Sequence, residues 1–268
     1  MQNKNPELGP LGAKFFAYAQ MHRLDIVRLG EIQKPLDISP LQERRLLERL
    51  NRDGFVFRLQ RGVYIVPEKI TAGGFWHPND YLIVVKYMEL HKAHYYIGGL
   101  TAFNRHGFST QVPNQLTVYN DKISGVKKFG KFVIRFIKTA KNRITSFDKL
   151  PIPSHQQTIN IANLPRTILD AINNWKRYQM LPEAYIWLRK HYSNKKFLQN
   201  FIRLTTQSAN NNTMRRIGFY LEQLGVDDDI LLPILKKLKP TKAWILLIPN
   251  NNRRGKTSKK WGIINNAK

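Results

Sequence analysis

The chain has 268 residues, with 44 Lys and Arg against 18 Asp and Glu, so its formal net charge is +26. Its content of 42% hydrophobic and 11% aromatic residues argues against a disordered polycation. The longest apolar run, Ala243 to Ile248, is far shorter than the roughly 20 residues of a membrane-spanning helix, and no apolar signal segment follows Met1. The absence of cysteine excludes disulfides, thiolate metal sites and cysteine nucleophiles. We therefore expect a cytoplasmic protein with a polyanionic partner.

The positive charge is distributed unevenly along the chain. Residues 1–69 have 12 Lys and Arg and 8 Asp and Glu, a net charge of +4. Residues 70–268 have 32 and 10, a net charge of +22. Most of the positive charge therefore lies outside the segment that contains the clearest nucleic-acid motif.

The first 70 residues have the pattern of a winged helix-turn-helix. Apolar periodicity predicts helices at residues 11–21 and 25–30. Ser39, Pro40 and Gln42 form a capping box with a proline at the first helical position, which predicts a third helix that ends at Asp53-Gly54. Two short strands, 55–59 and 62–66, then form a hairpin.

The rest of the chain predicts a larger mixed α/β domain. After a junction at residues 71–79, a buried helix is expected at 80–94 and a short helix after Gly98-Gly99. Strands follow at 115–119, 131–137 and 158–162, with the first two joined by a turn rich in Lys and Gly. The C-terminal half is helical, at residues 165–173, 182–192, 195–206, 213–224 and 227–238. A hairpin of residues 244–248 and 261–264 around a basic loop ends the chain. The fold class is therefore α+β, with domains at 1–70 and 80–268.

The third helix has a face suited to reading DNA. Gln42, Arg45, Arg49 and Arg52 recur at intervals of three, four and three residues and share one stripe. An α-helix fits the major groove, where Arg bonds to guanine and Gln to adenine, and arginines on a neighbouring hairpin contact phosphates. The candidate DNA-binding residues are Gln42, Arg44, Arg45, Arg49, Arg52, Arg58 and Arg61.

The alternative interpretation is that this helix has an ordinary solvated face. Glu43 and Glu48 favour that alternative, because a carboxylate on the same surface repels phosphate. Glu48 is also four residues from Arg44, which is the spacing of an intrahelical ion pair.

Four segments resemble antitoxins of the AbiEi type. They are LNRDGFVFRLQRGVY at 50–64, YIGGLTAFNRHGFSTQVPN at 96–114, IANLPRTILDA at 161–171 and MRRIGFYLEQLG at 214–225. The resemblance extends from about Leu11 to Asn265, although no single segment is as specific as a metal-binding motif.

The resemblance implies an antitoxin of a bacterial type IV toxin–antitoxin system with a role in abortive phage infection. Such a protein represses its own operon by binding inverted repeats through the winged helix. Its C-terminal domain, here residues 80–265, counteracts a nucleotidyltransferase toxin, and a stable complex between the two is not implied.

We expect neither catalysis nor a cofactor. No Glu-x-Lys or Asp-x-Lys triplet of a restriction-type nuclease is present. Asp227 and Asp229 are explained by the start of a helix, where carboxylates favour the helix dipole. His91 and His94 lack the additional ligands of a metal site, and Gly98-Gly99 is not followed by the Lys-Ser/Thr of a phosphate-binding loop.

A second hypothesis is a plain winged-helix regulator whose basic C-terminal domain binds RNA or coats nucleic acid. Trp244 and Trp261 flank the last basic loop, where they either stack on bases or belong to a hairpin core. The candidate residues for nucleic-acid or partner binding are Lys127, Lys128, Arg215, Arg216, Arg253, Arg254, Lys259 and Lys260.

Overall fold

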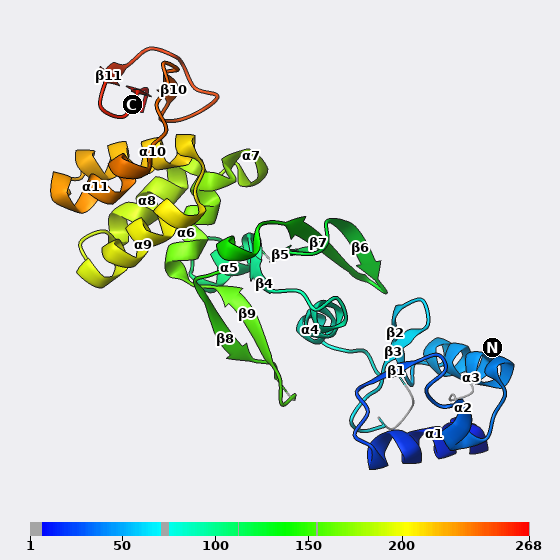
Figure 1. Cartoon of the computed structure of the whole chain (residues 1–268). Helices are drawn as coiled ribbons and strands as arrows, with labels where there is room; N and C mark the ends of the chain where they lie inside the picture. Colours follow the sequence, from blue (N-terminus) through cyan, green and yellow to red (C-terminus); the bar gives the residue numbers. More distant parts are fainter. Residues whose placement is uncertain (1–6, 71–74, 112, 154, 268) are drawn as a thin grey trace. The chain divides into compact units, whose positions relative to one another are not determined.

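The computed structural model describes residues 7–70, 75–111, 113–153 and 155–267 (Figure 1). The chain divides into two compact units, which we describe separately. The first comprises Met1–Ala93, Lys128–Phe132 and Pro151–Ile159, and the second comprises the remaining residues, His94–Lys127, Val133–Leu150 and Asn160–Lys268. The sequence placed the junction at residues 71–79, of which 71–74 lie outside the described residues. The prediction assigned the helix that follows this junction to the second domain. In the structure this helix belongs to the first unit.

The first unit consists of short helices and a three-stranded antiparallel sheet with strand order β1-β3-β2. Its elements are α1 (Gly9–Met21), β1 (Ile26–Arg28), α2 (Gln33–Leu36), α3 (Pro40–Arg52), β2 (Phe57–Gln60), β3 (Val63–Ile65) and α4 (Asp80–Leu90). Leu47 and Leu50 of α3 pack with Phe15 and Phe16 of α1 in a continuous apolar core. This core fixes α3 on one side and leaves its other side exposed.

The helix predicted at residues 25–30 is wrong, because this segment contains strand β1. Ile26 pairs with Ile65 and Arg28 with Val63 across an antiparallel ladder. Val27 is fully buried, and β-branched residues such as Ile and Val pack well on a pleated surface. Pairing with a strand almost forty residues away therefore decides the conformation of this segment.

Helix α4 packs in the first unit through a buried cation and an aromatic contact. Lys86 is only 2% exposed, and its ammonium group donates hydrogen bonds to Asp25 and, at 3.3 Å, to Glu89. The ring of Tyr87 meets the edge of Phe129 at 5.1 Å between centroids. The helix ends at Leu90, four residues before the end predicted from the sequence.

A six-stranded mixed sheet has the strand order β6-β7-β5-β4-β9-β8. The strands are β4 (Tyr95–Gly98), β5 (Leu116–Asn120), β6 (Gly125–Phe129), β7 (Phe132–Lys138), β8 (Phe147–Pro151) and β9 (Thr158–Ala162), with α5 (Leu100–Arg105) after β4 and a 3-10 turn, η1 (Lys141–Arg143), after β7. Strands β5 and β7 run parallel, with Leu116 opposite Ile134. Residues 125–129, predicted as part of a turn, form β6 instead, because a parallel neighbour requires the chain to cross back.

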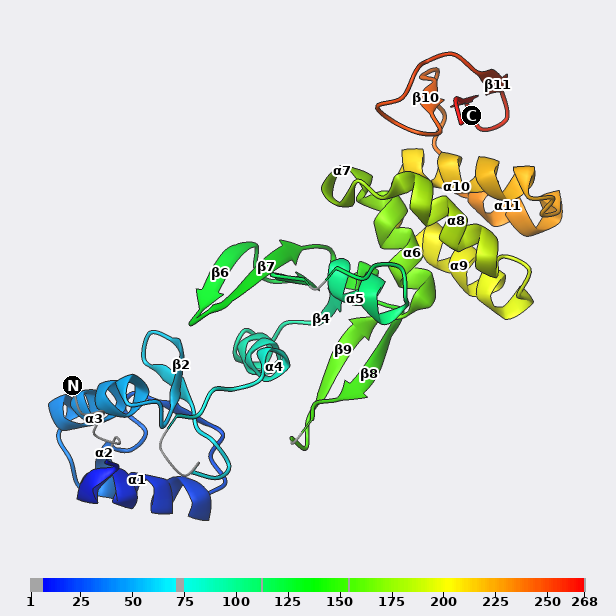
Figure 2. The ribbon, with the colours of Figure 1, turned by 180° about the vertical axis from the view of Figure 1, so that it is seen from behind.

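The helical character of the C-terminal half was predicted correctly, although the short helix α7 (Trp175–Tyr178) was not predicted. This half contains α6 (Leu164–Asn173), α7, α8 (Leu181–His191), α9 (Lys195–Ser208), α10 (Asn211–Gln223) and α11 (Asp228–Lys237). Helices α8 to α11 pack side by side in both views (Figures 1 and 2). Their apolar faces share one hydrophobic core, in which Phe201, Ile217 and Leu188 are fully buried.

The C-terminal strands form a sheet with an order that the sequence did not predict. Strands β10 (Ile245–Leu246), β11 (Lys256–Ser258) and β12 (Ile263–Asn265) have the order β10-β12-β11. The antiparallel hairpin is β11–β12, whereas β10 pairs with β12 in parallel. The predicted hairpin of residues 244–248 with 261–264 is therefore wrong, because two strands that pair in parallel are not joined by a hairpin turn.

Candidate nucleic-acid interface

Exposed arginines of the first unit lie on α3, on β2 and in the β2–β3 turn. The Ser39 hydroxyl accepts a hydrogen bond from the Gln42 backbone N–H at 3.3 Å, and the Gln42 side chain accepts one from the Ser39 N–H at 2.8 Å. This is the predicted capping box, and it fixes where α3 begins. Leu46, Leu47 and Leu50 are buried on the core side.

Both glutamates of α3 are bound by other groups of the first unit, so neither leaves an unpaired negative charge on this basic surface. The Glu43 side chain is 1% exposed, and its carboxylate accepts hydrogen bonds from the Gly30 and Ile32 N–H groups, at 2.9 and 3.3 Å, and from the Gln33 amide at 2.7 Å. Its negative charge therefore faces the start of α2. Glu48 forms the predicted ion pair with Arg44 at 3.0 Å.

The seven candidate residues differ in what holds their side chains. Arg44 is paired with Glu48, and Arg52 contacts Asp53 at 3.1 Å. The hydrogen bond from Arg44 to Glu48 raises the pKa of Arg44. Both arginines are thus partly neutralised by a neighbouring carboxylate.

Arg49 is held by backbone carbonyls. Its guanidinium donates to the carbonyl oxygens of Glu7 and Leu8 at 3.2 and 3.0 Å. A carbonyl oxygen satisfies donors without removing the positive charge, so Arg49 keeps its charge in a fixed position. Gln42 is committed through its carbonyl oxygen to the capping box, which leaves its amide nitrogen as the group available to a ligand.

Arg45, Arg58 and Arg61 have exposed side chains that form no hydrogen bond or ion pair with any residue in the described part of the chain. Arg58 lies on β2 and Arg61 in the turn before β3, so both come from the hairpin that follows α3. Burial raises the pKa of Tyr64, while the nearby charge of Arg58 opposes that shift. These three guanidinium groups are the ones free to bind an anion.

The basic residues predicted as binding candidates in the second unit differ in their exposure to solvent. Arg215 is 3% exposed and Arg216 is 7% exposed, so neither lies on a solvated basic surface. The guanidinium of Arg215 donates to the carbonyl oxygens of Trp261, Ala243 and Gly262, and so it ties α10 to the terminal sheet. Burial lowers the pKa of both arginines.

The terminal basic loop is only partly available to an external ligand. Lys260 donates hydrogen bonds to Glu222 and Asp228, each at 2.5 Å, and these bonds raise the pKa of Lys260. Trp261 is 1% exposed and bonds Glu222 at 3.0 Å, which supports the core interpretation for this residue, whereas Trp244 is 42% exposed. The remaining candidates are exposed: Lys127, Lys128, Arg253, Arg254 and Lys259.

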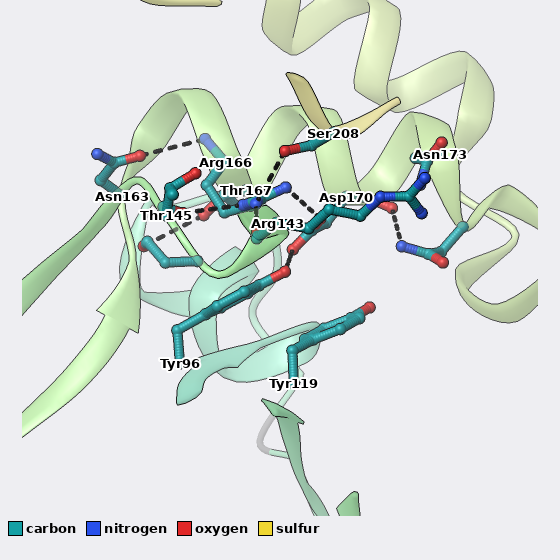
Figure 3. Close-up of polar contacts among 12 residues, drawn as sticks. Tyr96, Tyr119, Arg143, Thr145, Asn163, Arg166, Thr167, Asp170, Asn173 and Ser208 are labelled. Atoms are coloured by element: carbon teal, nitrogen blue, oxygen red, sulfur yellow. Dashed lines mark hydrogen bonds and ion pairs between the residues drawn. The ribbon is translucent and has the colours of Figure 1, made fainter. Parts of the chain in front are cut away.

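The second unit also contains a buried polar centre that the sequence pattern did not predict (Figure 3). The Asp170 carboxylate lies 3.5 Å from the Arg166 guanidinium and accepts a hydrogen bond from the Tyr96 hydroxyl at 3.0 Å. Arg166 also donates to the carbonyl oxygens of Arg143 and Thr145. Burial raises the pKa of Asp170 to about 6, against the opposing effects of Arg166 and Tyr96. The i,i+4 spacing of Arg166 and Asp170 was the sequence signal for this pair.

This centre is structural, because its charged groups are closed to solvent. Arg166 and Asp170 are each 3% exposed, and the Tyr96 ring stacks on Tyr119 at 5.0 Å between centroids. Tyr119 and Tyr178 share a hydrogen bond of 2.6 Å. In the described residues, no group of three His, Cys, Asp or Glu side chains is arranged to hold a metal ion, and His94 instead contacts Asp121 at 3.0 Å.

Comparison with known proteins relates the chain to others mainly by fold. A family of unknown function, DUF6088, matches residues 36–160, which is less than half of the chain. The crystal structure of the RV2827C protein from Mycobacterium tuberculosis is similar, with a TM-score of 0.61 and 10% sequence identity over 97% of this chain and 92% of that chain. The search of curated proteins gave no match. None of the helices in the described ranges has the length and apolar character needed to cross a membrane.

Proposed function

We propose that the first unit is a winged helix-turn-helix that binds duplex DNA. In this proposal α3 enters the major groove and the β2–β3 hairpin, the wing, contacts the sugar–phosphate backbone. The observation that carries it is the combination of Arg45 on α3 with Arg58 and Arg61 on the hairpin, three exposed arginines that pair with none of the residues the structure describes. The burial of Glu43 supports it further, because the carboxylate that most opposed DNA binding is turned inward.

The available charges suggest different roles for the arginines. Arg45 lies in the first half of α3, and it is in this part of a recognition helix that side chains reach base edges. Arg58 and Arg61 are suited to phosphates, which position the protein without reading sequence. A modest net charge of +4 in residues 1–69 is compatible with this proposal, because three exposed arginines of this segment come from α3 and the hairpin that follows it.

We further propose that the whole chain acts as a type IV antitoxin that represses its own operon and counteracts a nucleotidyltransferase toxin. This part is supported by the four AbiEi-like segments, three of which lie in the second unit. Growth of cells that express a nucleotidyltransferase toxin of the AbiEii type tests it. Rescue by the full chain, and by a variant that no longer binds DNA, is expected. Toxicity that is unchanged by the full chain would contradict the antitoxin role and leave DNA binding intact.

The DNA-binding proposal is tested by fluorescence anisotropy with the full chain. A duplex from the promoter upstream of the gene is titrated at several salt concentrations, beside a scrambled duplex of the same length. Loss of a base contact at Arg45→Ala should weaken specific binding by about 1–3 kcal/mol. Loss of a phosphate contact at Arg58→Ala should weaken binding to both duplexes and reduce the salt dependence by about one charge.

Two control variants separate this surface from general charge. Arg44→Ala removes an arginine from the same helix that already has a carboxylate partner at 3.0 Å, and it should change the affinity less than Arg45→Ala. Lys236→Ala removes an exposed lysine from α11 in the second unit. If Arg45→Ala and Lys236→Ala weaken DNA binding equally, α3 is not the recognition helix.

A further inference from the structure

A cavity with a volume of about 660 Å³ lies in the second unit between the end of α6, the short helix α7 and the start of α10. Asparagines and cations surround one aromatic ring in it. The residues that matter to the argument are Asn173, Trp175, Lys176, Asn212 and Arg216. A volume of this size is typical of cavities that hold small organic ligands.

Arg216 is a buried cation that lines this cavity and has no counterion in the described residues. It is 7% exposed, and its Nε donates to the carbonyl oxygen of Leu246 at 3.0 Å. Its two terminal nitrogens form no hydrogen bond with a described residue. Since an unpaired buried charge is costly, an anion in the cavity would give these donors the partner they lack.

Trp175 gives the cavity an aromatic surface beside that cation. The guanidinium carbon of Arg216 is 5.9 Å from the centroid of the Trp175 ring, and the Lys176 ammonium is 5.6 Å from it. The ring is half-buried and Lys176 is exposed. A planar ring next to two cations combines the features that bind a base by stacking and a phosphate by charge.

The asparagines supply both a rigid frame and free amide groups. The Asn173 side-chain oxygen accepts hydrogen bonds from the Asn210 N–H and amide, at 3.2 and 3.0 Å, and thereby fixes the end of α6 against the start of α10. Asn212 is exposed and its side chain bonds no other described residue. An amide offers a donor and an acceptor side by side, which matches the edge of a nucleobase. The first turn of α10, a helix of 13 residues, adds positive potential from its N–H groups.

We propose that this cavity binds a nucleotide, with the phosphate at Arg216 and Lys176 and the base against Trp175. The phosphate neutralises Arg216, and Asn212 contacts the base edge. Neither Arg216 nor Trp175 belongs to the surface proposed to bind DNA, so nucleotide binding is independent of that function.

Isothermal titration calorimetry of the full chain tests this proposal. The probes are the ribonucleoside monophosphates, ATP and inorganic tripolyphosphate. At least one nucleotide should bind, and tripolyphosphate should bind at least about tenfold more weakly because it cannot stack. Trp175→Ala and Lys176→Ala should each weaken nucleotide binding roughly tenfold.

The controls keep the result interpretable. Lys190→Ala removes an exposed lysine of α8 and should leave nucleotide binding unchanged, as should the Arg45→Ala variant of the first unit. Lys176 is exposed, so its variant should fold like the wild type, which circular dichroism checks. Three outcomes would overturn the proposal: no binding of any nucleotide at about 1 mM, binding of tripolyphosphate as tight as that of ATP, or unchanged binding in the Trp175→Ala, Lys176→Ala double variant.

Discussion

The raised pKa of the buried Asp170 carboxyl predicts that the stability of the protein depends on pH. Its pKa is raised to about 6 from an ordinary value of 3.8, with burial as the largest cause. Between these two values the native protein holds a proton that the unfolded chain has released. The contribution of Asp170 to the free energy of unfolding therefore falls as the pH rises from about 4 to 6, and it is constant above that range.

The size of this effect follows from the geometry around Asp170. The attraction of Arg166 acts across 3.5 Å, and Tyr96 supplies one hydrogen bond; together they do not offset the removal of the carboxylate from water. A shift of this size corresponds to about 3 kcal/mol. Asparagine resembles the protonated carboxyl in shape but does not titrate, so Asp170→Asn should lack this slope.

The measurement is urea unfolding of the wild type and of Asp170→Asn across pH 4–7, followed by circular dichroism. The difference between the two proteins isolates this group, because every other titrating side chain is common to both. We expect the difference to change by up to about 3 kcal/mol in favour of the variant as the pH rises.

A matched control is Asp148→Asn, which breaks an ion pair with Arg105 whose side chains are 30% and 44% exposed. Its difference from the wild type should stay within about 1 kcal/mol at every pH. If the difference for Asp170→Asn is equally flat, Asp170 is ionised throughout the range. The attraction of Arg166 then outweighs the cost of burial, and our reasoning fails.

Two further predictions concern packing in each unit. Glu43→Gln should destabilise the first unit by about 1.5–3 kcal/mol, because the amide has no negative charge and replaces one of the two acceptor oxygens that the three donors share with an NH2 group. Thermal unfolding measures this, and a change below about 0.5 kcal/mol would show that the carboxylate does not hold α2. Gly218→Ala should destabilise the second unit by about 1–3 kcal/mol or more, because its Cβ would lie 2.1 Å from a carbon of the Trp261 ring. The smaller ring of Trp261→Phe should recover part of that loss when the two changes are combined, and no recovery would place the strain elsewhere.

Much of the first unit was predictable because its signals are local. The capping box of Ser39 and Gln42 and the leucines of α3 lie within one helix, so sequence spacing alone defines the element. Strand β1 was not predictable in this way. The partner that makes residues 26–28 a strand is β3, and nothing in the short segment itself reveals that pairing.

The burial of Arg215 and Arg216 could not be predicted from the sequence either, because it also depends on residues that are distant in the chain. An Arg-Arg pair on an amphipathic helix is normally solvated, and the carbonyl oxygens that receive Arg215 lie at residues 243, 261 and 262. The two strands that bring them together pair in parallel, an order that the sequence pattern did not suggest. The cavity beside Arg216 was missed for the same reason, since residues 173–176 and 210–216 are far apart in the sequence and are joined by the hydrogen bonds from Asn210 to Asn173.

The net charge of +26 does not by itself give the attraction for DNA, because the contribution of each basic side chain depends on the group that it contacts in the structure. A carboxylate partner, as at Arg44, cancels most of the field that a phosphate would feel. Carbonyl partners, as at Arg49, leave the full charge but restrict where it points. Arg45 has neither restriction, so neighbouring positions of one helix should contribute to DNA affinity in the order Arg45, Arg49, Arg44. A count of basic residues predicts equal contributions, and the order therefore distinguishes a specific recognition surface from a general attraction to polyanions.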